Sequence, residues 1–273
     1  MLLGIFALIA LAAALVMGFQ AGVWAALGTF VGGLLLLCLG MFLYLLYLCS
    51  RVDQNVPQED DDPHYRKVTN LILESVLPVL RIHIKKKGLE KMPKEGRFLL
   101  VCNHCSDSDP IVLMRSFAKY QLAFISKREN STMFVIGPMM HKLLCQLINR
   151  ENDREALKTI LRCIEILKED KASVAVFPEG GILTEDSKLH HFKPGVFKIA
   201  QKAKVPIVVC TLRDTPPVLS NFTHLKPSTV EVRLLKVIYP EEYENITTVE
   251  LADRIYGMMA EDLGPDRVSQ ENA

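Results

Sequence analysis

The sequence of 273 residues predicts an α/β fold, a largely parallel twisted sheet flanked by helices, preceded by an N-terminal membrane-embedded two-helix segment. Beyond residue 63, short apolar runs typical of buried strands alternate with stretches of helical periodicity, which is the pattern of an α/β sandwich. Residues 1–50 contain no Asp, Glu, Lys, Arg or His, so all of the charge lies in the rest of the chain.

The apolar N-terminal segment consists of two runs, Leu2–Met17 and Val23–Leu48, separated by Gly18–Gly22. A membrane-spanning helix needs about 20 apolar residues at about 1.5 Å each, and the second run exceeds that length. A secretory signal peptide would carry positive charge ahead of its apolar core, and a buried helix rarely lacks a charged face over such a length. We therefore expect residues 1–50 to form a membrane hairpin that either spans the bilayer or dips into one leaflet.

The remaining chain divides into an acidic, proline-containing linker at 51–63 and one domain at 64–273, which is long enough for a real core. The net charge of +1 gives no indication of a nucleic-acid partner. The cysteines of the domain fall mostly in apolar runs without metal-type spacing, which favours reduced thiols in a domain on the cytoplasmic face of a membrane. These cysteines are Cys102, Cys105, Cys145, Cys163 and Cys210.

The elements of the domain follow from their periodicities. Apolar residues recur at helical spacing between Arg154 and Glu169, residues 97–102 form a continuous apolar run, and Thr247 with Glu250 makes a capping box for a last helix. The expected helices cover 64–79, 110–118, 154–169 and 196–203, and the expected strands cover 80–84, 97–102, 121–126, 145–149, 173–177, 205–212 and 230–238.

Polar segments follow three of the expected strands. Asn103–Asp109 follows the strand at 97–102, Pro178–Gly181 follows the strand at 173–177, and Arg150 follows the strand at 145–149. Ligands of open α/β sheets bind outside the carboxyl ends of the strands, so we expect these segments to share one rim.

The segment Asn103–Asp109 allows three interpretations from its residues alone. Asp109 before Pro110 suits the N-cap of a helix, which would leave His104 as an ordinary polar residue at a strand end. A metal could be bound by His104, Asp107 and Asp109 with help from His190 and His191, although no recurrent metal spacing is present.

The third interpretation is a catalytic pair, with His104 as a general base oriented by the carboxylate of Asp109. The two would lie about 140° apart on a continuous helix, but a strand–turn–helix junction can fold back and join them. No Gly-x-Ser-x-Gly elbow occurs in the chain, so the base would activate a hydroxyl of the substrate.

Asn103-His104-(x)4-Asp109 after an apolar strand, with Phe177-Pro178-Glu179-Gly180 about 70 residues later, resembles the glycerolipid acyltransferase family typified by 1-acylglycerol-3-phosphate acyltransferase. The resemblance covers roughly residues 80–215. Further matching pieces occur in the same order, at residues 88–93, 126–127, 147–150, 192–195 and 205–208.

Four positions depart from the pattern of that family. Gly181 and Ile182 stand where Thr-Arg is common, Leu144 replaces a leading glycine, and Val209 replaces a proline. The arginine helps to grip the phosphate in family members that act on lysophosphatidic acid, and isoleucine lacks the guanidinium fork that matches a phosphate. The departure at Ile182 therefore also allows an acceptor with a different headgroup.

The resemblance implies transfer of a fatty acyl group from acyl-CoA or acyl carrier protein to the free hydroxyl of a lysophospholipid, with 1-acylglycerol-3-phosphate as the first expectation and phosphatidic acid as the product. His104 would act as the base and Asp109 would orient it, with no cofactor and no metal, and a backbone N–H near Gly180 would face the oxyanion. The residues expected to bind substrate are Lys127, Arg150, Glu179, Gly180 and Lys193. Two other functions stay open, a membrane-bound phosphoesterase that uses a metal and a non-catalytic lipid-binding protein.

Overall fold

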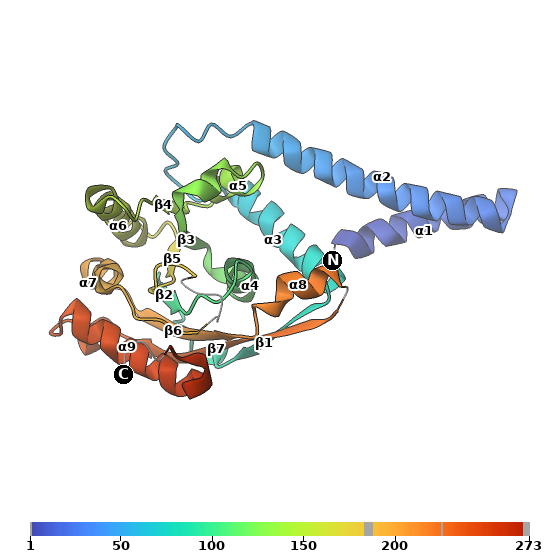
Figure 1. Cartoon of the computed structure of the whole chain (residues 1–273). Helices are drawn as coiled ribbons and strands as arrows, with labels where there is room; N and C mark the ends of the chain where they lie inside the picture. Colours follow the sequence, from blue (N-terminus) through green and yellow to red (C-terminus); the bar gives the residue numbers. More distant parts are fainter. Residues whose placement is uncertain (1, 183–187, 225, 270–273) are drawn as a thin grey trace.

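The computed structural model describes residues 2–182, 188–224 and 226–269, and shows a helical hairpin projecting from an α/β domain (Figure 1). Helix α1 (Leu2–Ala21) and helix α2 (Val23–Ser50) are interrupted only at Gly22, whose φ of 90° makes the turn. The sequence predicted a break between the two helices at residues 18–22. That prediction is wrong for residues 18–21, which continue α1. Both helices are long and apolar enough to cross a membrane by length and composition.

Small residues line the contact between the two hairpin helices. A Cβ atom on Gly33 would lie 3.6 Å from the Cβ of Ala10, and Ala10 and Ala14 are the buried residues of α1. Small residues allow two helix backbones to approach closely where lipid rather than water surrounds them. The large apolar side chains point outward instead, as Phe19 (97% exposed) and Trp24 (85% exposed) show.

The segment that joins the hairpin to the domain is held by charge pairs. Asp61 is buried and forms a 2.6 Å ion pair with Arg66, whose guanidinium also donates to the carbonyl of Leu122. Asp62 caps helix α3 (Pro63–Val79) by accepting from the backbone N–H of His64. The polar run at 51–63 is thus fixed to the domain at its C-terminal end.

The domain is built on a seven-stranded sheet with strand order β1-β7-β6-β2-β5-β3-β4. Every neighbouring pair is parallel except β6 and β7, which are antiparallel. The strands are β1 (Ile82–Lys87), β2 (Leu99–Cys102), β3 (Leu122–Lys127), β4 (Gln146–Ile148), β5 (Ser173–Val176), β6 (Ile207–Arg213) and β7 (Ser228–Ile238). The predicted fold class, a largely parallel sheet flanked by helices, is confirmed.

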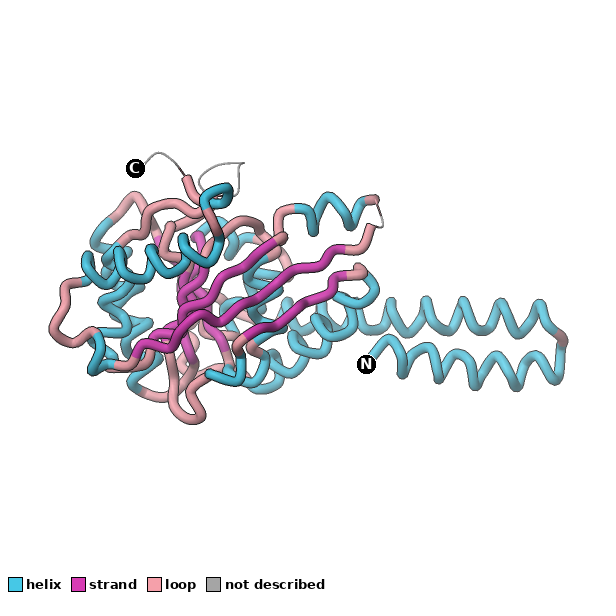
Figure 2. The backbone as a smooth tube through the Cα atoms, turned by 90° about the horizontal axis from the view of Figure 1, so that it is seen from below, coloured by secondary structure: helices cyan, strands magenta, loops and turns pink. Residues whose placement is uncertain are grey.

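Helices cover both faces of this sheet (Figures 1 and 2). One core is closed by α6 (Asp153–Lys168), α7 (Lys198–Ala203) and α9 (Thr248–Leu263), and the other by α3, α4 (Asp109–Ser116) and α8 (Pro217–Thr223). Helix α5 (Ile136–Lys142) packs with α3 against the end of α2 through Met139, Leu48 and Cys49.

Most expected elements lie within two residues of their predicted bounds, and the Thr247–Glu250 capping box is present at α9. The strand expected at 80–84 begins instead at Ile82, because Arg81 adopts a left-handed φ of 56° that separates it from α3. The short helices α5 and α8 were not predicted.

Candidate active site

His104 and Asp109 form a hydrogen-bonded pair at the carboxyl end of β2, the central strand of the sheet. His104 Nδ1 lies 2.9 Å from Asp109 Oδ2. The same oxygen accepts the backbone N–H groups of Cys105 at 2.6 Å and Ser106 at 2.9 Å, which folds the loop back over the carboxylate. The expected N-cap role of Asp109 is therefore wrong, because α4 begins at Asp109 itself and its side chain bonds the loop that precedes it.

The surroundings of His104 present one ring nitrogen to a ligand. Asp109 is fully buried, whereas the His104 side chain keeps 15% of its surface exposed. The ring stacks on Phe177 with centroids 4.0 Å apart. With Nδ1 donating to the carboxylate, Nε2 is left as the acceptor, and within the described ranges no residue hydrogen-bonds it.

Asn103 fixes the start of this loop to the neighbouring strand. Its side-chain oxygen accepts the N–H of Leu212 at 2.7 Å, and its amide nitrogen donates to the carbonyl of the same residue at 3.0 Å. These two bonds continue the β2–β6 ladder by one step beyond Cys102. The residue that precedes His104 is therefore held by the sheet.

Glu179 joins three segments beneath the imidazole. Its Oε1 accepts the backbone N–H of His104 at 2.7 Å, and its Oε2 accepts that of His190 at 2.9 Å. Burial raises the pKa of this carboxyl to about 8, although the two N–H donors act in the opposite direction. Sequence reasoning placed Glu179 at the rim but missed this bridge, which links residues 75 positions apart.

Two of the expected cations lie against the turn that follows Glu179. Arg150 reaches Gly181, and Lys193 reaches Gly180. The prediction that the segments after β2, β4 and β5 share one rim is thus confirmed. The N–H of Gly180 donates to the carbonyl of Phe177 at 3.0 Å, so a donor to the oxyanion would have to be another N–H of this turn.

The other predicted residues lie at the margins of this site. Lys127 ends β3 beside β4 with an exposed side chain, and no hydrogen bond or ion pair connects it to His104 or Glu179 among the residues described. Ile182 is partly buried after Gly181. The described part of the chain contains no group of three or more His, Cys, Asp or Glu side chains arranged to hold a metal ion.

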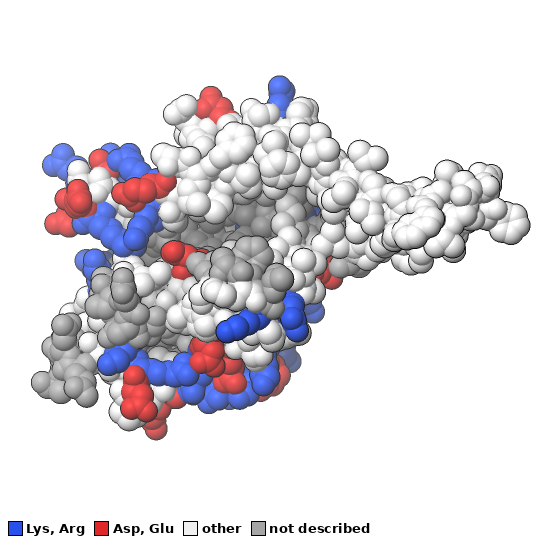
Figure 3. Space-filling model, turned by 45° about the vertical axis from the view of Figure 1, so that its right-hand side comes forward, with Lys and Arg blue, Asp and Glu red and all other residues white. Residues whose placement is uncertain are grey.

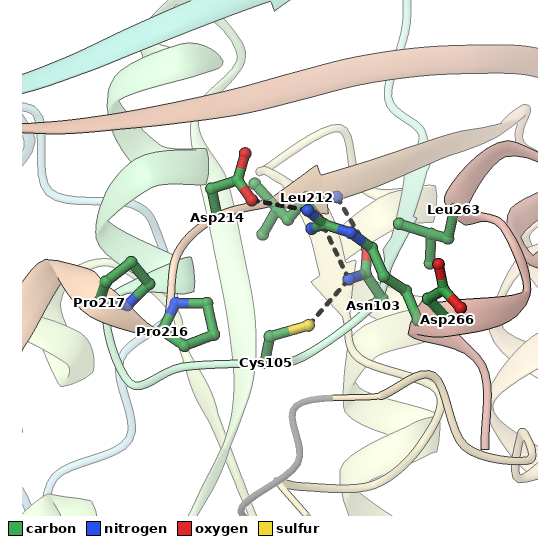
Figure 4. Close-up of a pocket in the computed structure, with 9 residues that line it drawn as sticks. Asn103, Cys105, Leu212, Asp214, Pro216, Pro217, Leu263 and Asp266 are labelled. Carbon is green, nitrogen blue, oxygen red and sulfur yellow. Dashed lines mark hydrogen bonds and ion pairs between the residues drawn. The ribbon is translucent and has the colours of Figure 1, made fainter.

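A cavity of about 220 Å³ adjoins the loop at Asn103 and Cys105 (Figure 4). Its lining residues are Asn103, Cys105, Leu212, Asp214, Pro216, Pro217, Leu263, Asp266 and Arg267. His104 is not among them. Burial raises the pKa of the Cys105 thiol to about 12, so this neighbour of His104 stays protonated and is a poor nucleophile at neutral pH.

The domain is hollowed on the face next to the hairpin, and the hairpin surface shows no Lys, Arg, Asp or Glu (Figure 3). Charged side chains gather on the opposite parts of the domain in that view. The seven cysteines are all free, which agrees with the reduced thiols expected for the five cysteines of the domain.

Comparison with known proteins identifies what this arrangement resembles. Residues 83–213 match a family model described as Acyltransferase. The chain is 28% identical over 203 residues to a probable 1-acyl-sn-glycerol-3-phosphate acyltransferase of Mycoplasma genitalium, covering 70% of this chain and 73% of that protein. It is 27% identical over 187 residues to the 1-acyl-sn-glycerol-3-phosphate acyltransferase of Saccharomyces cerevisiae, covering 68% and 61%.

Among solved structures, the fold is similar to that of the 1-acyl-sn-glycerophosphate (LPA) acyltransferase PlsC from Thermotoga maritima. The TM-score is 0.62 at 21% identity, with 94% of this chain and 95% of that chain covered. Several curated relatives are covered over less than two thirds of their own length, such as a chloroplastic enzyme of Arabidopsis thaliana at 44%.

Proposed function

Because the chain belongs to the glycerolipid acyltransferase family, we propose that it moves a fatty acyl group from a thioester donor to the free hydroxyl of 1-acylglycerol-3-phosphate, giving phosphatidic acid. The observation that carries this proposal is the 2.9 Å bond between His104 Nδ1 and Asp109 Oδ2, which leaves Nε2 as a base at the rim of the sheet. The relatives named above supply the identity of the acceptor.

In the proposed reaction, Nε2 of His104 takes the hydroxyl proton as the lipid oxygen attacks the thioester carbonyl. An oxygen–carbon bond forms, the carbon–sulfur bond breaks, and the imidazolium returns the proton to the leaving thiolate. Asp109 stabilises the imidazolium and fixes the ring, as the carboxylate of a hydrolase triad does. A substrate hydroxyl thus takes the place of the serine nucleophile, and general-base catalysis of this kind contributes roughly 10²–10⁴ in rate.

The phosphate of the acceptor would be bound by the cations that border Gly180 and Gly181. Arg150 presents a guanidinium fork, which pairs with two phosphate oxygens at once, and Lys193 adds a point charge. Lys127 at the end of β3 extends this positive rim toward the solvent. This placement supports a phosphate acceptor even though Ile182 stands where the family commonly has arginine.

The hairpin would hold the active site at the bilayer surface. Both acyl chains of the product dissolve in the bilayer, whereas acyl-CoA and acyl carrier protein, the two donors proposed, are soluble in water. The hollowed face beside the hairpin lets a lysolipid enter laterally from the membrane (Figure 3). The reduced thiols are consistent with a domain on the cytoplasmic face.

A thiol-release assay on the purified protein tests this function. Turnover is measured with acyl-CoA and with acyl carrier protein against 1-acylglycerol-3-phosphate and against lysolipids that carry a choline or ethanolamine headgroup. We expect thiol release that depends on the acceptor and is fastest with the free phosphate. Faster turnover on the larger headgroups would instead favour the alternative that Ile182 suggests, and binding without thiol release would contradict catalysis.

A further inference from the structure

Gly180 and Gly181 each have a cationic side chain in the space where their own side chain would begin. A Cβ atom on Gly181 would lie 2.6 Å from Nη1 of Arg150, and a Cβ atom on Gly180 would lie 2.8 Å from Cε and 3.0 Å from Nζ of Lys193. Non-bonded contacts between heavy atoms have their optimum at about 3.5–4.0 Å. Any side chain at Gly181 must therefore displace the guanidinium or shift the turn.

The two cations reach this turn from different parts of the fold. Arg150 lies two residues beyond the end of β4, and the backbone N–H of Lys193 donates to the carbonyl of Pro178 at 2.8 Å. Across the ranges that the structure describes, no carboxylate forms an ion pair with either cation. Burial lowers the pKa of Arg150, and the charge of Glu129 opposes that effect.

Two cations without a carboxylate partner at one turn fit an anion that carries more than one negative charge. Gly180 and Gly181 are adjacent, with Cα atoms about 3.8 Å apart, so Arg150 and Lys193 border the same turn. The turn is tied to His104 through Glu179, whose Oε1 accepts the His104 N–H. A phosphate bound here would lie beside the base.

We propose that Gly181 is a specificity-determining residue, because its missing side chain leaves the space in which Arg150 sits and so lets the Gly180–Gly181 turn hold two cations around a phosphate monoester. On this view Arg150, which follows β4, supplies a guanidinium in place of the arginine that the family commonly has at the position of Ile182. The inference rests on the proposed acyl transfer for its substrate, but the binding of a phosphate monoester can be measured without any transfer.

A double-mutant cycle between Gly181 and Arg150 tests this proposal. The variants are Gly181→Ala, Arg150→Ala and the combination, and the measurements are KM and kcat for 1-acylglycerol-3-phosphate and the Kd for glycerol 3-phosphate. We expect Gly181→Ala to raise KM and Kd by about tenfold, in the range for loss of a charge-assisted hydrogen bond, with a smaller change in kcat. In the Arg150→Ala background the same substitution should have little further effect.

Two control variants separate this role from backbone strain. Gly96 also has a positive φ, of 78°, and a Cβ atom there would meet nothing within 4 Å, so Gly96→Ala reports left-handed strain without a displaced cation. The strain of an alanine at the φ of 152° of Gly181 is common to both Arg150 backgrounds, so it cancels in the cycle. Gly180→Ala with Lys193→Ala forms the parallel cycle for the second cation. The thermal midpoint of each variant reports on folding.

Three outcomes would overturn the proposal. Gly181→Ala could leave KM and Kd unchanged, it could raise them as much in the Arg150→Ala background as in the natural chain, or the natural chain could fail to bind glycerol 3-phosphate. If the cycle is coupled in glycerol 3-phosphate binding but no thiol is released, the acyl transfer fails and the role of Gly181 stands. If thiol is released but the cycle shows no coupling, the acyl transfer stands and the proposed role of Gly181 fails.

Discussion

The catalytic loop and the hairpin distribute their side chains in opposite ways. In the loop at residues 103–109, Asn103, Ser106, Ser108 and Asp109 are buried. Oδ2 of Asp109 accepts three hydrogen bonds, whereas its Oδ1 has no partner among the described residues. In the hairpin, large apolar side chains such as Trp24 are exposed and only small ones such as Ala10 are buried. A buried carboxylate is stable only where donors surround it, and an exposed apolar surface of this size is favourable only against lipid or a partner. The loop thus suits a polar site inside the fold, and the hairpin surface suits an apolar environment.

The largest expected effect comes from removing the charge of the buried carboxylate. Asp109→Asn should lower kcat by about 10²–10⁴, because an amide oxygen can accept the same hydrogen bonds but carries no charge to stabilise the imidazolium. The measurement is steady-state thiol release, with far-UV circular dichroism to verify folding. Turnover within a factor of two of the natural protein would show that the pair is not catalytic.

The attachment of the hairpin to the domain, through residues 51–63, can be weakened at Arg66. Arg66→Leu leaves Asp61 buried without its partner, so the free energy of unfolding should fall by about 3–5 kcal/mol. The matched control is Lys236→Ala, which breaks an exposed pair with Glu242 and should cost less than about 1 kcal/mol. Chemical denaturation in detergent measures both. Equal losses in the two variants would mean that residues 51–63 are not fixed to the domain as described.

The buried carboxyl of Glu179 should make stability depend on pH. The fold raises its pKa from 4.5 to about 8, so the folded chain binds this proton more tightly than the unfolded chain does. The resulting stabilisation is complete below pH 4.5 and is lost as the pH rises toward 8. Glu179→Gln cannot titrate, so its free energy of unfolding should vary less between pH 5 and 8 than that of the natural chain. Identical slopes would contradict the raised pKa.

The smallest effect is spectroscopic and tests the exposed apolar surface of the hairpin. Trp24 is the single tryptophan of the chain, so its fluorescence reports on the hairpin alone. In vesicles of brominated lipids we expect Trp24 to be quenched. A Trp24→Phe, Val249→Trp variant, which places tryptophan at an exposed site on α9, should not be. If the brominated lipids quench Trp24 no more than the tryptophan on α9, the hairpin is not inserted in the bilayer.

Most of the fold could be predicted because strands and helices carry local periodicity. The strand at 97–102 and the helix at 154–169 have apolar patterns that burial enforces, and both exist within two residues of the prediction. The helices α5 and α8 have seven residues each, too few to display a period. The antiparallel pairing of β6 with β7 depends on the path of a connection that no local pattern records.

The site could be predicted in its parts but not in its contacts. His104, Asp109, Glu179 and Arg150 follow strand ends, and that position alone places them at one rim. The bridge from Glu179 to His104 and His190, and the fit of Arg150 against Gly181, join residues far apart in the chain. Such contacts depend on side-chain packing in three dimensions, so neither composition nor spacing reveals them.

The central claim is that the imidazole of His104 removes the proton from a lipid hydroxyl. The most direct test is kcat for thiol release by purified His104→Ala protein with 1-acylglycerol-3-phosphate. The account predicts a folded protein whose kcat falls by about 10²–10⁴ while its affinity for glycerol 3-phosphate is retained. A His104→Ala protein that releases thiol at the natural rate would contradict it.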